Sequence, residues 1–299
     1  IPTTVGKEFA VFADRLIERA HEIEGCKLKG KLNGAIGNYS ALNTAYPSHD
    51  WPIFGKQFVE AHGLVFNPLT TQIESHDSWI ALFDRIRHAN TTVIGLDQDM
   101  WGYISDDYFV QRKEDGAVGS STMPQKVNPI RFENSEGQLG VANTLLVQFA
   151  QKLPISRFQR DLSDSTTSRW ICPAFAATEM SYANTLKGLD LVVPNHDHLA
   201  RELDAHWEVL AEPIQIVLRR DGRIDAYDML RAQTQGRTWR QEDVKAFVRN
   251  ANLSARIETE LLELSPEKYI ELEKRIFEQH APEIIDDSQM IILRTVLTR

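Results

Sequence analysis

The sequence has few of the features that mark secreted, membrane-spanning or nucleic-acid-binding proteins. Only two of its 299 residues are cysteines, and their spacing matches no metal-binding motif. We therefore expect Cys26 and Cys172 to be buried thiols rather than a disulfide, in a reducing, cytoplasmic compartment. No apolar run approaches the roughly 20 residues that a membrane-spanning helix needs. The formal net charge of −9 argues against a nucleic-acid-binding surface, so neither a membrane nor a nucleic acid is an expected partner.

Alternating runs of apolar and polar residues, which mark β-strands, are nearly absent as well. Apolar residues instead recur at helical spacing over long stretches. This pattern predicts helices at residues 5–24, about 79–101, about 133–152 and about 165–191. The last three have broad apolar faces, which is typical of a bundle in which each helix buries more than one side. The glycine-rich residues 27–39 are predicted to form a short hairpin or a bend.

The composition of the chain changes near residue 193. Beyond Pro194 charged residues become more frequent, and prolines and glycines divide the predicted helices into shorter ones. We therefore predict two domains, a helical-bundle domain at residues 1–193 and a smaller helical domain at residues 194–299. The predicted fold class of the whole chain is all-α.

Residues 119–129, with the sequence GSSTMPQKVNP, form neither helix nor strand in this prediction, because Pro124 and Pro129 interrupt backbone hydrogen bonding. Such a loop can present backbone N–H groups, two hydroxyls, an ammonium group and an amide to a small anionic ligand. Ser120 is the candidate general base and needs activation by its surroundings, because a free hydroxyl is a very weak acid. The alternative is an ordinary surface turn in which Ser120 is only a capping residue.

A second polar cluster, at residues 156–169, contains three arginines and several serines around a predicted helix start. N–H groups at a helix N-terminus, a hydroxyl and guanidinium groups together form a suitable phosphate-binding site. In the alternative interpretation the arginines are exposed and their charges are balanced by Asp161 and Asp164.

The proline-bounded loop resembles the signature loop of the fumarase/aspartase superfamily, whose members eliminate fumarate from a substituted succinate. The resemblance implies that Ser120 is the catalytic base and that Lys126 and Asn128 contact a substrate carboxylate. It also implies that Ser121 binds substrate and that Glu133 orients a catalytic histidine. A carboxylate such as Glu133 is also favoured in the first turn of a helix by the helix dipole, so both roles remain open.

The second cluster is similar to that of adenylosuccinate lyases, a branch of the same superfamily. The phosphate-binding residues of that branch match Arg160, Ser165 and Arg169. Its substrate-contacting glutamine matches Gln72 in the segment NPLTTQIE. Residues 206–215, HWEVLAEPIQ, also resemble the bacterial form of these enzymes, and we assign them no chemical role.

This resemblance, which runs from residue 2 to about residue 280, implies a fold, a reaction and an assembly. The fold is a long-helix bundle of the fumarase/aspartase type with a smaller helical C-terminal domain. The reaction is β-elimination of fumarate from adenylosuccinate, giving AMP, and from the succinylocarboxamide ribonucleotide of purine biosynthesis (SAICAR to AICAR). The substrate is a small nucleotide, no metal or organic cofactor is implied, and the assembly is a homotetramer with active sites shared between subunits.

The acid histidine of the family lies in a Thr-His-Gly-Gln-Pro motif that precedes the segment matching residues 2–8. We therefore expect this chain to lack that histidine together with the N-terminal domain. His76 lies at a predicted helix start and is interpreted as a structural residue. Two alternatives remain: an argininosuccinate lyase, because Gln125 is typical of that branch, or a catalytically inactive structural relative or fragment.

Overall fold

The computed structural model describes residues 2–113, 122–123, 126–270, 275–276 and 279. Helices dominate the described residues, with only two short two-stranded sheets between them, so the predicted all-α fold class is confirmed. None of the helices in the described part of the chain has an apolar stretch that could span a membrane.

Most internal contacts fall within two compact units, which we call the bundle unit and the C-terminal unit. Of the described residues, the bundle unit comprises 14–101, 122–123 and 126–191, and the C-terminal unit comprises 2–13, 102–113, 192–270, 275–276 and 279. Two helices, α1 (Val5–Glu24) and α4 (Asp77–Ser105), contribute residues to both units. The domain boundary predicted from composition, at residues 193 and 194, stays a prediction.

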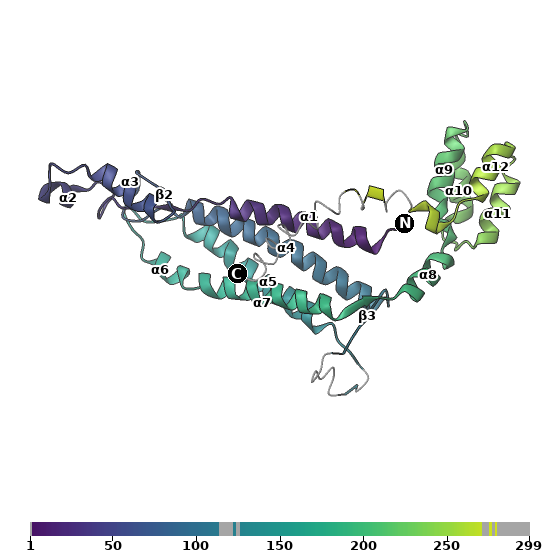
Figure 1. Ribbon diagram of the computed structural model, residues 1–299, viewed down its shortest axis with the longest axis horizontal. Helices are drawn as coiled ribbons and strands as arrows, with labels where there is room; N and C mark the ends of the chain where they lie inside the picture. Colours follow the sequence, from purple (N-terminus) through teal and green to yellow (C-terminus); the bar gives the residue numbers. More distant parts are fainter. Residues whose placement is uncertain (1, 114–121, 124–125, 271–274, 277–278, 280–299) are drawn as a thin grey trace. The chain divides into compact units, whose positions relative to one another are not determined.

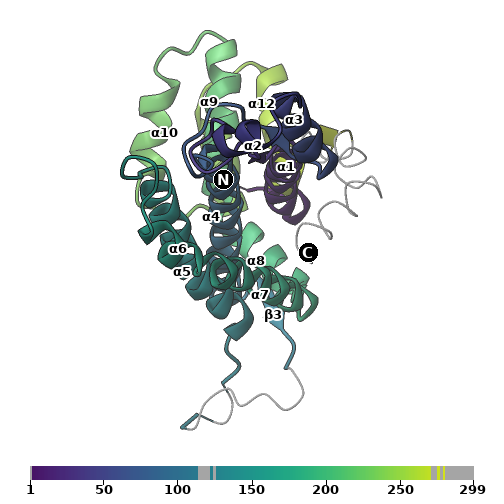
Figure 2. The same ribbon diagram turned by 90° about the vertical axis from the view of Figure 1, so that its left-hand side faces the viewer.

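The bundle unit is built on α4 together with α5 (Ile130–Lys152) and α7 (Ile171–Asp190), which pack side by side (Figure 1). Figure 2 shows the same helices from one end. Their apolar faces meet in a core that includes Phe83, Leu146, Phe149, Leu153 and Ala174. Burying each of the leucine and phenylalanine side chains in this core contributes roughly 1.5–3 kcal/mol, so the shared core stabilises the bundle more than helix propensity does.

The observed helices follow the predicted ones except near residue 170. The N-terminal helix has the predicted bounds, and α4 and α5 extend a few residues beyond theirs. The single helix predicted at residues 165–191 is wrong, because the chain forms α6 (Ser163–Ser168) and then α7. Pro173 explains the break: it has no N–H to donate to the carbonyl of Arg169, and its ring would clash with that carbonyl.

The segment between α1 and α4 carries β1 (Lys29–Gly30) and β2 (Val65–Phe66), which pair in parallel. Parallel strands need a crossover connection, which here contains α2 (Ser40–Ala45) and α3 (Trp51–Ala61). The hairpin considered for residues 27–39 is therefore wrong, and the bend is what the structure shows. The partner of β1 lies far along the chain, which no local pattern indicates.

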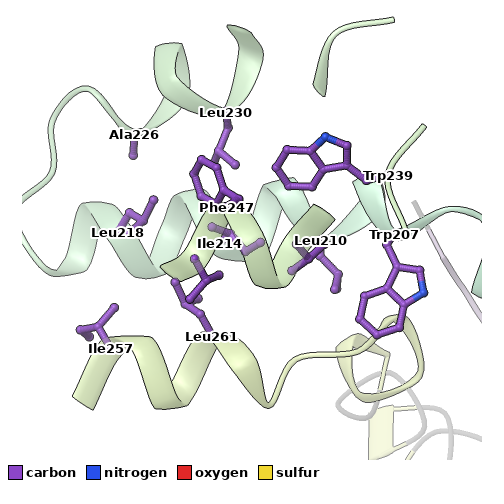
Figure 3. Close-up of a cluster of buried hydrophobic side chains, with 12 residues drawn as sticks. Trp207, Leu210, Ile214, Leu218, Ala226, Leu230, Trp239, Phe247, Ile257 and Leu261 are labelled. Carbon is purple, nitrogen blue, oxygen red and sulfur yellow. The ribbon is translucent and has the colours of Figure 1, made fainter. Parts of the chain in front are cut away.

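The C-terminal unit contains a two-stranded antiparallel sheet of β3 (Phe109–Gln111) and β4 (Val192–Pro194). Its helices follow one another as α8 (His196–Ala205), η1 (Trp207–Leu210), α9 (Ala211–Arg220), α10 (Ala226–Thr234), α11 (Gln241–Asn250), α12 (Ala255–Leu262) and α13 (Pro266–Tyr269). Side chains from these short helices converge on one buried cluster around Ile214, Leu218 and Leu261 (Figure 3).

Candidate functional site

The loop that resembles the superfamily signature is described only in part. Ser120, Ser121 and Gln125 lie outside the described residues. The exposed Lys126 and the half-buried Asn128 lie in irregular chain that leads directly into α5. Pro129 occupies the N-cap of α5. Because proline has no backbone N–H to donate, regular secondary structure does not extend from α5 into the residues before it.

Glu133 lies in the first turn of α5, where a negative charge is favoured by the helix dipole. Its Oε1 accepts a hydrogen bond of 3.2 Å from the indole Nε1–H of Trp101 on α4. One turn further along both helices, the side-chain amide of Gln98 donates to Oε1 of Glu136 at 2.8 Å. The carboxylate of Glu133 is therefore exposed at the end of the bundle but held by a neighbouring helix.

Sequence reasoning missed Trp101, which lies at the end of a predicted helix and resembles an ordinary core residue there. About half of its surface is exposed in the structure. The contact with Glu133 depends on how α4 and α5 pack against each other, and neither helix carries a local pattern that indicates it.

A buried carboxyl group, Asp97, lies in the bundle one turn before Trp101 and is almost fully enclosed. The hydroxyl of Thr185 on α7 lies 2.7 Å from its Oδ1 and 2.8 Å from Oγ of Ser135 on α5. Burial raises the pKa of Asp97 to about 7, although hydrogen bonds from Ser135 and Thr185 act in the opposite direction. The negative charge of Glu136 adds to the increase, so Asp97 stays protonated to a much higher pH than an ordinary carboxyl group.

The predicted phosphate cluster begins beyond the C-terminal end of α5 and extends through α6. Ser165 donates its hydroxyl to the carbonyl oxygen of Leu162 at 2.7 Å. The Nη2 of Arg160 lies 4.0 Å from Oδ1 of Asp164, and Arg169 is exposed at the end of α6. The predicted balance of charge between arginine and aspartate side chains is therefore present, but Arg160 and Asp164 are too far apart for a direct hydrogen bond.

Asp161 organises the beginning of this cluster. The backbone N–H of Ser163 donates to its Oδ1 at 2.9 Å, and the ammonium group of Lys152 lies 3.4 Å from its Oδ2. Hydrogen bonding by Ser163, assisted by the charges of Lys152 and Arg157, lowers the pKa of Asp161 to about 2. This carboxylate thus stays ionised and fixes the turn on which Arg160 and Ser165 are mounted.

Gln72 lies beside the predicted phosphate cluster. Its backbone N–H donates to the carbonyl oxygen of Gln159 at 3.2 Å, and Gln159 immediately precedes Arg160. The side chain of Gln72 is exposed. The structure therefore joins two predicted site segments that are about 90 residues apart in the sequence.

Among the described residues, the two predicted halves of the site lie apart from each other. Glu133 and Lys152 lie near opposite ends of α5, about 28 Å apart at a rise of about 1.5 Å per residue. The signature loop precedes the first end, and the contact between Lys152 and Asp161 keeps the phosphate cluster at the second end. One bundle unit therefore carries the two halves at its two ends.

His76, the histidine nearest a predicted motif, lies immediately before α4 with a positive φ of 65°. Its ring packs edge-on against Trp79 at 5.0 Å, and its backbone N–H donates to Oε2 of Glu74 at 2.8 Å. These contacts agree with the structural interpretation of this residue.

The motif at residues 206–215 organises the core of the C-terminal unit. Oε2 of Glu208 accepts a hydrogen bond of 2.9 Å from the backbone N–H of Trp239, and Oε1 of Glu208 lies 2.7 Å from Nδ1 of His206. Oε2 of Glu212 accepts from the hydroxyl of Tyr269 at 2.7 Å. Its acidic residues therefore tie distant segments together, which explains the motif without a chemical role.

Two family models match most of the chain. The model described as "Lyase" matches residues 1–143, and the model described as "Adenylosuccinate lyase C-terminal" matches residues 156–270. The chain is also 45% identical, over 269 residues, to adenylosuccinate lyases of Haemophilus influenzae and Escherichia coli K12. The chain belongs to the adenylosuccinate lyase family. These matches cover 90% of the chain but only 59% of each relative, so the chain spans about three-fifths of the relatives' length.

The adenylosuccinate lyase family shares its architecture with more distant enzymes. The structure matches 3-carboxy-cis,cis-muconate lactonizing enzyme from Pseudomonas putida with a TM-score of 0.67, over 97% of this chain and 64% of that one. The two are 19% identical, so this likeness shows the helical-bundle fold alone. Among the described residues, no group of three or more His, Cys, Asp or Glu side chains is arranged to hold a metal ion.

Proposed function

We propose that this protein acts as an adenylosuccinate lyase, which eliminates fumarate from adenylosuccinate and from SAICAR. The observation that carries the proposal is the hydrogen bond between Gln72 and Gln159. It joins the glutamine segment to the cluster of Arg160, Ser165 and Arg169, which suits a nucleotide phosphate better than the small acids of other superfamily members. The names of the relatives, at 45% identity, support the same reaction and its place in purine biosynthesis.

In the proposed mechanism, the enzyme removes a proton from the carbon next to a carboxylate, and the resulting dianion needs positive charge and N–H donors around it. Ser120 takes the proton, and the ammonium group of Lys126 and the amide of Asn128 hold the carboxylate. The histidine that protonates the departing amine is expected from a segment preceding these residues. In this proposal the role of orienting that histidine falls to Glu133, whose carboxylate accepts a hydrogen bond from Trp101.

We also propose a homotetramer in which each active site is shared between subunits. The two halves of the site lie about 28 Å apart along α5, so each half needs a complementary half from another copy. Large apolar side chains on the surfaces of α5 and α7, including Val141, Val147 and Met180, are exposed in the single chain. Contact with further copies of the bundle would bury them.

The proposed compartment is the cytoplasm. Both cysteines are free thiols, which supports a reducing compartment. The expectation that both are buried is wrong, because Cys26 is half-buried and Cys172 is exposed. An argininosuccinate lyase is less well supported, because the named relatives are adenylosuccinate lyases and argininosuccinate has no phosphate for Arg160 to bind.

The proposal is tested by following the absorbance change on mixing the protein with adenylosuccinate. The chain is assayed alone and after extension at its N-terminus to the length of its relatives. We expect turnover only in the extended form, since that form supplies the acid histidine. Turnover of argininosuccinate instead, or of neither substrate in either form, would reject the proposed function.

The role of Ser120 is tested in the extended form with the Ser120→Ala variant. Loss of the base predicts that elimination falls by at least about 100-fold while adenylosuccinate still binds, because binding depends on other groups. An exposed serine outside the site, Ser105 at the end of α4, provides the matched control, Ser105→Ala. Turnover retained by Ser120→Ala would remove Ser120 as the base.

A further inference from the structure

The bend at residues 31–37 has no part in the proposed mechanism, yet it packs directly against the segment that carries Gln72. The ammonium group of Lys31 donates to three backbone carbonyl oxygens: those of Gly34 at 3.1 Å, Thr71 at 2.9 Å and Gln72 at 2.8 Å. Among the described residues, no carboxylate is paired with Lys31. A lysine in this arrangement links two loops rather than balancing a charge.

Three acceptors match the three N–H donors of an ammonium group, so its hydrogen-bonding capacity is filled. Burial disfavours the charged form and lowers the pKa of Lys31. A partly desolvated cation with three carbonyl partners holds them more strongly than an exposed lysine does, because hydrogen bonds to charged donors are stronger than neutral ones.

The backbone of Gln72 is thereby held on both sides. Its carbonyl oxygen accepts from Lys31, and its N–H donates to the carbonyl oxygen of Gln159, next to Arg160. The side chain of Gln72, in contrast, is exposed on the surface. The Lys31 contact therefore helps to set the position of Gln72 relative to the phosphate cluster.

The same bend also holds the residue two positions before Gln72. The buried Asn33 donates its side-chain amide to Oγ1 of Thr70 at 2.9 Å. Gly37 has a φ of 80°, and a Cβ added to it would lie 2.1 Å from the carbonyl oxygen of Thr70. Such close approach is possible only for glycine at this position. Gly37 thus allows the bend that carries Lys31 to approach the segment of Thr70 to Gln72 closely.

We propose that Lys31 is a positioning residue for substrate recognition, which acts by fixing the backbone of Gln72 beside the phosphate cluster. This inference rests on the proposed function, in which Gln72 contacts the nucleotide substrate. Lys31 itself touches no substrate in this arrangement, so its effect on catalysis is transmitted entirely through Gln72.

The first test compares steady-state kinetics of the extended protein and its Lys31→Met, Gln72→Ala and doubly substituted variants. Lys31→Met is expected to raise KM for adenylosuccinate about tenfold with little change in kcat. This is the effect of losing an interaction that stabilises the bound substrate and the transition state equally. The double variant should show the same KM as Gln72→Ala alone, because Lys31 acts only through Gln72. Two losses that multiply in the double variant would overturn the proposal.

The matched control is Lys56→Met, which removes an exposed lysine of the same unit whose only described partner is Glu60 at 4.0 Å. This control should leave both KM and kcat unchanged. If Lys31→Met fails to fold, Lys31→Gln, which keeps two N–H donors but no charge, is measured in the same way and carries the same expectations.

The second test needs no activity and separates this inference from the proposed function. Hydrogen exchange at the amide of Gln72 is measured without substrate in the parent protein, in Lys31→Met and in Lys56→Met. We expect exchange to become about tenfold faster in Lys31→Met only. That substitution removes the hydrogen bond to the carbonyl oxygen of Gln72, so the backbone of this residue opens more often. Unchanged exchange would overturn the positioning role, whether or not the protein turns over adenylosuccinate.

Discussion

Replacing Asp97 by asparagine is predicted to stabilise the protein at neutral and alkaline pH but not at acidic pH. Burial raises the pKa of this carboxyl group from its ordinary value of 3.8 to about 7. In the folded state the neutral acid is therefore favoured, and ionisation destabilises the fold. Asparagine resembles the neutral acid in shape and keeps an oxygen that accepts the hydroxyl of Thr185.

The magnitude follows from the difference between the two pKa values. A difference of about 3 units corresponds to about 4 kcal/mol between the two protonation states. Below about pH 4, Asp97 is protonated in both the folded and the unfolded chain, and the penalty is absent. The folded state loses stability as the pH rises from about 4 to 7, and above pH 7 the loss is complete.

The assay is urea denaturation of the parent protein and Asp97→Asn between pH 5 and pH 8, followed by circular dichroism. The free energy of unfolding of Asp97→Asn minus that of the parent should increase by about 3 kcal/mol over this range. Other titrating groups are common to both proteins and cancel in the difference. The opposite sign, or a difference independent of pH, would refute the reasoning.

The control for Asp97→Asn is Asp84→Asn on the same helix. Asp84 is exposed, and its carboxylate lies 3.5 Å from Nε of Arg87. Exposed ion pairs contribute between about 0 and 1 kcal/mol, so this variant should differ little from the parent protein at every pH. A pH dependence of similar size in both variants would mean that the effect does not come from burial of Asp97.

Two further predictions concern packing and hydrogen bonding in the bundle. Gly188→Ala should lower the free energy of unfolding by roughly 1–3 kcal/mol in urea denaturation, because the added Cβ would lie 2.7 Å from Cζ of the buried Phe132; an unchanged midpoint would show that this ring moves easily. Tyr182→Phe removes the hydroxyl that donates to Oδ1 of the buried Asn90 at 2.6 Å and should cost about 1–3 kcal/mol in the same assay. A stabilised Tyr182→Phe variant would contradict the importance of that hydrogen bond.

Much of the helical architecture was predictable from short sequence patterns. The helix at Val5–Glu24 follows from the spacing of its apolar residues. The end of α5 follows from Pro154, because a proline disfavours helix at the residue before it, whatever the tertiary structure. The family was predictable for a similar reason. The residues of the signature loop and of the arginine cluster are close together in the sequence, so each cluster is visible before folding.

The pairing of distant segments was decided only by the tertiary structure. The contacts of Trp101 with Glu133 and of Lys31 with Gln72 join residues 32 and 41 positions apart, and no local pattern marks either pair. The protonation of Asp97 also depends on enclosure by three helices, whereas in the sequence it is one more polar residue on α4.

The sequence alone thus determined most of the long helices and which lyase family the chain belongs to, since both depend on neighbouring residues. The tertiary structure decided that the two halves of the candidate site lie at opposite ends of α5. The reason is geometric: Glu133 and Lys152 lie near the two ends of one helix, and its rise of about 1.5 Å per residue holds them about 28 Å apart.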